Sequence, residues 1–111
     1  MNIKILVTAI GQHIIAGVKV IENTETQVRV AYWVQQPRII VYRQGEEGKT
    51  NLNLVPYCLA SDENEFSISE NHVVAILEPR DDILEAYREQ VFSSEVTEVT
   101  ELEGVDEVDQ D

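Results

Sequence analysis

The sequence predicts a mostly β domain over residues 1–92, which ends in a short C-terminal helix. Apolar and polar residues alternate along several short segments, which is the pattern of half-buried strands. Gly, Pro and Asn residues separate these segments, as turns between strands require. The 111-residue length is that of one domain with a modest core, so association between copies would add stability.

The first two strands are predicted by alternation near the N-terminus. Apolar residues alternate over residues 3–7 and again over 14–21, with a turn signal between them. Gly17 interrupts the second segment and marks a bend or a bulge. The polar segment 22–26 then has the composition of a hairpin loop.

The third strand has the clearest period of two in the chain, over residues 27–34. Pro37 breaks the pattern, and residues 38–43 resume it, either as a separate strand or as a bent continuation. On this alternation Tyr32 and Tyr42 fall on the apolar face, so core packing is expected for both. Trp33 falls on the opposite face, where an exposed aromatic residue favours a protein interface.

The second half of the domain begins after an exposed loop. A strand begins at Leu52 and is made irregular by Pro56, and a short strand follows over residues 66–68. The apolar segment 73–77 predicts a buried strand.

The C-terminal helix is predicted to begin near Asp81 and Asp82, because carboxylates suit the positive end of a helix dipole. Its apolar residues, Leu84, Tyr87 and Val91, share one face. Residues 93–111 hold eight acidic residues and no Lys or Arg, which predicts a disordered acidic tail. Apolar residues at every third position leave open an amphipathic segment that orders on a partner.

Net charge argues against an ordinary nucleic-acid binder. The chain carries a formal charge of -13, and residues 1–92 still hold 13 acidic against 8 basic residues. No basic footprint is visible, and no apolar run reaches the roughly 20 residues of a membrane helix. The single cysteine excludes an internal disulfide, so a cytoplasmic location is expected. Neither a membrane nor DNA is expected as a partner.

No residue pattern predicts catalysis, a cofactor or a metal. Residues 45–50 resemble a phosphate-binding loop, but strand-like residues follow it and its two glutamates would repel phosphate. Cys58 with His13 or His72 has the chemistry of a nucleophile and a base, but no local signature supports the pair, and Cys58 is expected to be a small buried hydrophobe. No cysteine pair or calcium-loop spacing is present. The chain is therefore predicted not to be an enzyme.

Two stretches of the sequence resemble the signatures of Sm and Sm-like proteins. Residues 65–79 resemble the second signature, and residues 11–22 fit the first loosely. The matching positions in the second signature are Ile68, Asn71, Val73 and Ile76. Over residues 1–92 the chain is similar to Sm-like proteins encoded by cyanophages. The resemblance implies a strongly bent, five-stranded antiparallel open barrel, and the host cytoplasm as the location if the chain is of phage origin.

The resemblance also implies a homo-oligomeric ring, for example a pentamer or hexamer. In the family the fourth strand of one subunit pairs with the fifth strand of the next, which here are residues 52–59 and 72–77. The interface residues implied in this way are Leu52, Leu54, Tyr57, Val73, Ala75 and Leu77.

The RNA pocket of the family is only partly matched. Its equivalents here are Glu22, Thr26, Ser69, Glu70, Asn71 and His72. The arginine that stacks on a base is missing, and Glu70 stands where the family has a glycine. The resemblance therefore implies fold and ring assembly more strongly than RNA binding.

The function predicted from these observations is a non-enzymatic ring that acts as a protein-interaction scaffold. The alternative is a ring that binds RNA through a non-standard pocket, in RNA processing or as a chaperone. Clustering of the basic residues on one face would favour RNA. These residues are Lys19, Arg29, Arg38, Arg43 and Lys49.

Overall fold

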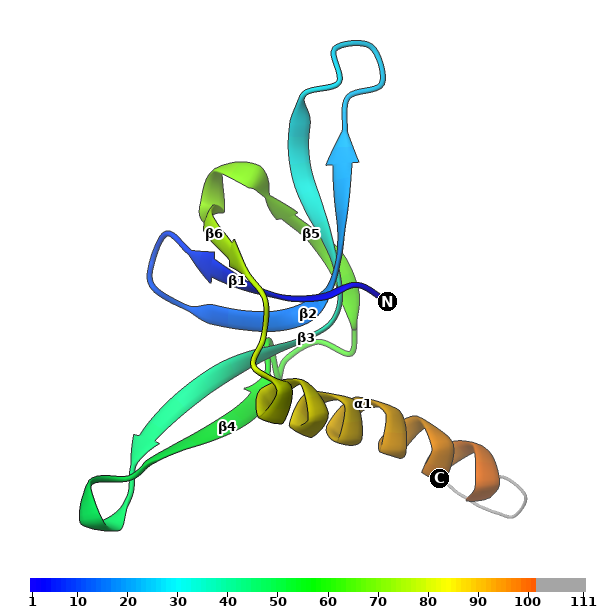
Figure 1. The fold of residues 1–111 in the computed structure, drawn as a ribbon. Helices are drawn as coiled ribbons and strands as arrows, with labels where there is room; N and C mark the ends of the chain where they lie inside the picture. The colour runs from blue at the N-terminus through cyan, green and yellow to red at the C-terminus, as the bar shows by residue number, and fades with distance from the viewer. Residues whose placement is uncertain (102–111) are drawn as a thin grey trace. The chain divides into compact units, whose positions relative to one another are not determined.

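The computed structural model describes residues 1–101, and the side chains of residues 1–92. The chain divides into two compact units, Met1–Pro79 and a second unit that begins at Arg80. The first unit holds the described strands and the second holds helix α1 (Asp81–Glu101) (Figure 1). The prediction of a mostly β chain with a C-terminal helix is confirmed.

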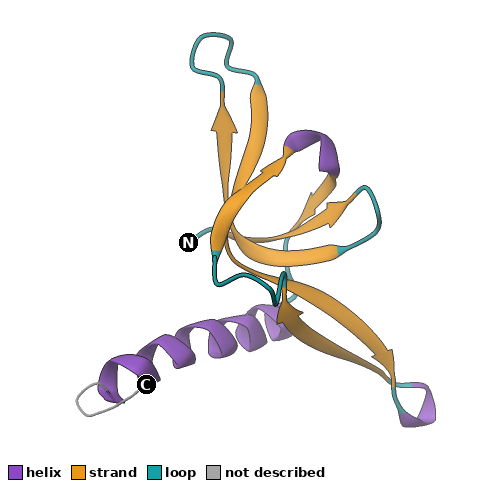
Figure 2. Cartoon of the chain, turned by 180° about the vertical axis from the view of Figure 1, so that it is seen from behind, coloured by secondary structure: helices purple, strands orange, loops and turns teal. Residues whose placement is uncertain are grey.

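The first unit is a single antiparallel sheet of six described strands, which run in the order β4-β3-β2-β1-β6, with β5 also paired to β3. The strands are β1 (Ile3–Thr8), β2 (His13–Glu22), β3 (Arg29–Gln44), β4 (Thr50–Pro56), β5 (Glu65–Ser69) and β6 (Val73–Leu77). Two short 3-10 helices lie in this unit. η1 (Glu46–Gly48) forms the tip of the β3–β4 hairpin, and η2 (Glu70–His72) joins β5 to β6 (Figure 2).

The resemblance implies five strands, whereas the described residues form six. β4 and β5 are separate strands that both pair with β3. β5 pairs with residues 31–35 of β3, and β4 pairs with residues 38–44. β2 pairs with the other side of β3 over residues 29–39. β4 and β5 therefore follow one another along the same side of β3, and residues 57–64 interrupt them.

A one-residue irregularity near the middle of β3 reverses which residues face the core. Gln36 has a positive φ of 51°, and the register between β2 and β3 shifts between Ile15 and Gly17. The register shift adjoins Gly17, where a bend or a bulge was predicted, and the extra residue lies in β3. Side chains alternate with a period of two, so an extra residue moves every later side chain to the opposite face.

Core packing was wrongly expected for Tyr42, which lies in the part of β3 that pairs with β4 alone. Tyr32 lies before the irregularity and is 5% exposed, whereas Tyr42 lies after it and is 51% exposed. Ile39 packs against the main cluster of the core, whereas uninterrupted alternation from Tyr32 would direct only the even-numbered residues of β3 toward that cluster. Tyr42 instead lies edge-on to His13, with its hydroxyl 2.6 Å from the His13 Nδ1.

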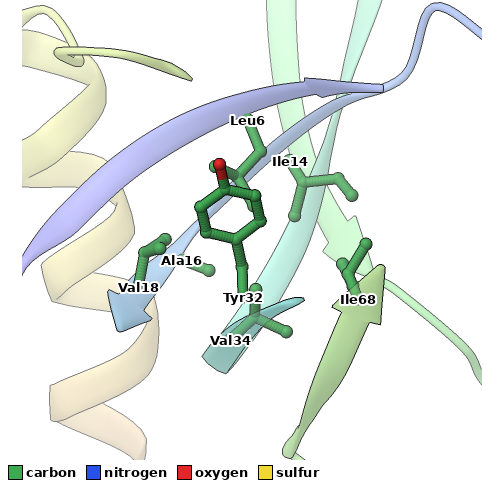
Figure 3. Close-up of a cluster of buried hydrophobic side chains, with 7 residues drawn as sticks. All are labelled: Leu6, Ile14, Ala16, Val18, Tyr32, Val34 and Ile68. Carbon is green, nitrogen blue, oxygen red and sulfur yellow. The ribbon is translucent and has the colours of Figure 1, made fainter. Parts of the chain in front are cut away.

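The hydrophobic core lies between β1, β2, β3 and β5. Its main cluster consists of Leu6, Ile14, Ala16, Val18, Tyr32, Val34 and Ile68, and Ile3, Ile15 and Ile40 are buried outside this cluster. The Tyr32 ring lies among these side chains (Figure 3). Burying one large aliphatic or aromatic side chain contributes about 1.5–3 kcal/mol, so this small cluster provides much of the stability of the unit. The buried Thr8 hydroxyl accepts a hydrogen bond from the backbone N–H of Gln12 at 3.0 Å.

Helix α1 begins at Asp81, as the sequence predicts. Asp82 forms an ion pair with Arg80 at 3.1 Å and accepts a hydrogen bond from the backbone N–H of Ile83. α1 continues to Glu101, past the expected end at residue 92. Residues 102–111 lie outside the described residues, so the disordered acidic tail stays a prediction. Within the described residues, no helix combines the length and apolar character needed to cross a membrane.

Candidate functional site

The edges of the sheet are the first feature with a functional consequence. Among residues 1–101, β4 and β5 each pair only with β3, and β6 pairs only with β1. Each of these strands therefore presents one side of its backbone unpaired within the chain. Unpaired N–H and C=O groups on an edge are a template for pairing with another strand.

β6 is the edge with the most exposed apolar surface. Val74 is 64% exposed and Leu77 is 52% exposed, and Ile76 is exposed beside them. Natural proteins protect edges with lysine, proline or bulges. β6 contains no charged residue and no proline, although its pairing with β1 has an irregularity between Val7 and Thr8. The edge is therefore open to a partner strand.

The prediction that residues 73–77 form a buried strand is wrong, since most of β6 is exposed or half-buried. A run of apolar residues predicts burial on both faces only when neighbouring strands or helices cover the strand. The local pattern contains no information on whether a strand lies at an edge. For this reason Val74 and Ile76 were not predicted as interface candidates. The feature of the sequence that indicates an interface here is an apolar strand without charged residues.

The predicted interface residues lie on or beside the two edge strands. Leu52 on β4 and Leu77 on β6 are exposed, whereas Leu54, Val73 and Ala75 are half-buried. Tyr57 follows β4, and its ring packs against Phe66 with centroids 5.1 Å apart. Leu52 and Leu77 are therefore the best placed of the six for contact with another chain.

The residues equivalent to the family's RNA pocket lie at one end of β3. β2 ends there at Glu22, β3 begins there, and β5 ends there at Ser69. Glu70, Asn71 and His72 form η2, and Thr26 lies in the β2–β3 loop.

The polar contacts of these residues stabilise turns. The Ser69 hydroxyl accepts a hydrogen bond from the backbone N–H of Asn71, and the His72 carbonyl accepts one from the backbone N–H of Ala9 at 2.8 Å. The Thr26 hydroxyl accepts a hydrogen bond from the backbone N–H of Val28. Among the described residues no hydrogen bond joins the β2–β3 loop to η2.

The five basic residues considered for RNA binding are spread over β2, β3 and the β3–β4 hairpin. Arg29 is the first residue of β3 and lies at the β2–β3 hairpin, whereas Lys19 lies in β2 opposite Trp33. Arg43 and Lys49 lie at the β3–β4 hairpin, and Arg38 lies between. The two hairpins project from opposite ends of β3 (Figure 1). These five residues therefore do not form one basic surface.

Trp33, the only tryptophan of the chain, lies on the face of β3 opposite the core. Its indole Nε1–H donates a hydrogen bond to Glu65 Oε1 at 2.9 Å. Lys19 on β2 and Ser67 on β5 lie directly opposite Trp33 on its two sides. Trp33 is half-buried, so it is less exposed than its position on the opposite face predicted.

The groups considered for catalysis lie in different elements, and no hydrogen bond joins them among the described residues. Cys58 is exposed in the loop after β4, so the prediction of a buried cysteine is wrong. His13 contacts Tyr42, whereas His72 lies in η2. The loop of residues 45–49 leads into strand β4. In the part of the chain that the structure describes, no three His, Cys, Asp or Glu side chains are grouped to hold a metal ion.

No protein-family model matches the chain, and no curated protein matches its sequence. The sheet edges and the exposed side chains are therefore the basis for inferring function.

Proposed function

We propose that the chain assembles into a closed homo-oligomeric ring with Sm-like architecture, and that the ring serves as a non-enzymatic scaffold for protein partners. The observation that carries the proposal is the unpaired, apolar edge at β6, together with the second unpaired edge at β4. The similarity of residues 65–79 to the second Sm signature supports the same assembly.

The physical basis is the pairing of two different edges. Contact between β6 of one copy and the β4 edge of the next is heterologous, and a heterologous contact produces a ring when its rotation closes. Strand pairing satisfies backbone groups on both edges and covers exposed side chains such as Val74, Ile76 and Leu77. It also adds buried area to a domain whose own core is small.

The distribution of charge favours protein partners over RNA. Binding to RNA draws most of its affinity from basic residues placed along the phosphate backbone. The five basic residues that would serve are divided between β2, the two hairpins and the middle of β3. The formal charge of -13 adds long-range repulsion of a polyanion.

The test is the mass of the purified chain by light scattering across a dilution series. We expect a discrete assembly of about five or six subunits that resists dilution, since closed rings have defined stoichiometry. A monomer at all concentrations would refute the ring.

An edge variant and a matched control sharpen this test. Ile76→Lys places a charge on the β6 edge and should release monomers that keep a cooperative unfolding transition. Val28→Lys makes the same kind of change at an exposed valine of the β2–β3 loop, outside both proposed edges, and should leave the mass unchanged. Equal effects of the two variants would contradict assembly through β6.

A further inference from the structure

A second group of residues on β2, β3 and β5 lies on the face of the sheet opposite the main cluster of the core. One cross-strand row consists of Lys19, Trp33 and Ser67, and the next row consists of Gly17, Gln35 and Glu65, in which the buried Gly17 lies beneath the Met1 side chain. The neighbouring residues Val18, Val34 and Ile68 point into the core, as strand alternation requires. We define the six residues of the two rows as the Trp33 surface.

We propose that the Trp33 surface binds an arginine-rich, extended segment of a partner protein. This inference rests on the proposed scaffold function and specifies the chemistry of the partner. The surface combines a partly exposed aromatic ring with a carboxylate that is already fixed against it. A guanidinium group stacks on an aromatic face and binds carboxylate oxygens, so it satisfies both features at once.

The geometry of Glu65 fits this role. Its Oε1 atom accepts the indole N–H of Trp33, which holds the carboxylate beside the ring. Among residues 1–92 the Glu65 side chain takes part in no ion pair, so the structure provides no cation of its own to it. Because tryptophan is the best cation–π partner, an arginine side chain placed here gains from the ring and from the carboxylate.

The charge around the surface selects a basic partner rather than RNA. Asp62 and Glu63 are exposed in the loop that leads into β5, and neither forms an ion pair among the described residues. Lys19 is the only cation among the six residues of the surface. Within the surface the Glu65 carboxylate and the Lys19 ammonium group balance, and the two carboxylates of the adjoining loop add negative charge, which favours arginine over phosphate.

The Trp33 surface is also compatible with ring formation. Strand pairing in the proposed ring uses the backbone edges at β4 and β6, which lie in the plane of the sheet. Side chains of the Trp33 surface stand roughly perpendicular to that plane. A ring of identical subunits would therefore present one copy of the surface per subunit, and a repeated basic segment could bind several copies with increased avidity.

Tryptophan fluorescence gives a direct test, because Trp33 is the only tryptophan in the chain. The full chain is titrated with a synthetic arginine–serine repeat peptide at low salt, and Trp33 emission is recorded. We expect a saturable change in emission with the basic peptide. A glutamate–serine peptide of the same length should cause none.

Three single substitutions assign the binding to this surface. Glu65→Gln keeps an acceptor for the indole but removes the charge, and should raise the dissociation constant about two- to fivefold, as for an exposed ion pair. Lys19→Gln removes the opposing cation and should lower the dissociation constant. Glu47→Gln, at the tip of the β3–β4 hairpin, removes the same charge elsewhere and should leave binding unchanged.

The outcomes separate this inference from the ring. No change in emission with the basic peptide would overturn it. So would equal losses in Glu65→Gln and Glu47→Gln, or a larger response to a single-stranded oligouridine than to the peptide. Light scattering on the same samples reports assembly independently, so a monomer that still shows the Glu65-dependent response would refute the ring alone.

Discussion

The two halves of β3 differ in their surroundings although their sequences alternate in the same way. Residues 29–35 lie between β2 and β5, and their inward side chains enter the core. Residues 38–44 pair with β4, and only the first two of them also pair with β2. Tyr32 in the first half is buried and Tyr42 in the second is exposed. Alternation therefore predicts a strand, but burial depends on how many neighbours the strand has.

The two halves of β3 should also contribute unequally to the stability of the first unit. A two-stranded ribbon is marginally stable in water, whereas three strands with a packed face support one another. The outer part of the β3–β4 hairpin is such a ribbon, with Tyr42 opposite Leu52 across the strands. Substitutions in the first half of β3 should therefore cost more stability than substitutions in the second. All variants are compared at one protein concentration, because assembly makes stability depend on concentration.

The largest expected loss is for Tyr32→Ala. Removing a buried aromatic side chain costs about 3–5 kcal/mol, through lost burial and the cavity that remains. Tyr42→Ala is the matched control and should cost below about 1 kcal/mol, because Tyr42 is half exposed. Denaturant unfolding measures both, and equal losses would show that the two halves do not differ in packing.

Gln36→Pro tests the irregularity that separates the halves. Proline fixes φ near −65°, whereas Gln36 has a φ of 51°, and its N–H donates to the Asn64 carbonyl at 2.7 Å. Strain and the lost hydrogen bond should together cost about 2–3 kcal/mol. Gln36→Gly retains the N–H and tolerates positive φ, so its free energy of unfolding should stay within about 1 kcal/mol of wild type. Tolerance of proline at this position would argue against the reversed register.

Ile39→Ala should produce a smaller loss. Ile39 is half-buried and packs against the core from just beyond the irregularity. Truncation should cost about 1–2 kcal/mol, at or below the low end for core aliphatic residues. Leu52→Ala, at an exposed site on the ribbon, should cost less. The reverse ranking in thermal or chemical unfolding would place the core boundary further along the hairpin.

Tyr42→Phe should produce the smallest change. The substitution removes only the hydroxyl that contacts His13 Nδ1, and the ring contact remains. Because the pair is exposed, the cost should be about 0.5 kcal/mol or less. The His13 ring resonances in an NMR spectrum should nonetheless shift, and unchanged resonances would contradict the contact.

The sequence predicted the strand pattern, the irregularity beside Gly17 and the start of α1, because each depends on neighbouring residues. It did not predict the strand count, since β4 and β5 are separate segments that share one partner. It also did not predict the exposure of Cys58 or of the β6 edge. These depend on contacts between residues far apart in the sequence, which local periodicity does not contain.

For the candidate functional residues, the sequence predicted the position on a strand face but not the contacts with other strands. The outward position of Trp33 followed from the period of two, but its hydrogen bond to Glu65 required the pairing of β3 with β5. The sequence showed no basic footprint and left open whether the basic residues cluster on one face, and the structure spreads five of them over β2, β3 and the β3–β4 hairpin. Val74 and Ile76 were missed because an apolar run was interpreted as a buried strand.

The pairing of β1 with β6 has a consequence for how the chain is made. β1 is synthesised first, yet one of its two neighbours in the sheet is β6, the last strand of the first unit. While translation is under way, β1, β2 and β3 can associate, but one side of β1 remains unpaired until residues 73–77 have left the ribosome. Pairing between distant segments also slows folding, because loop closure precedes the contact. A nascent chain stalled before β6 would therefore expose the backbone of β1 to neighbouring chains, and rapid completion of synthesis protects against aggregation.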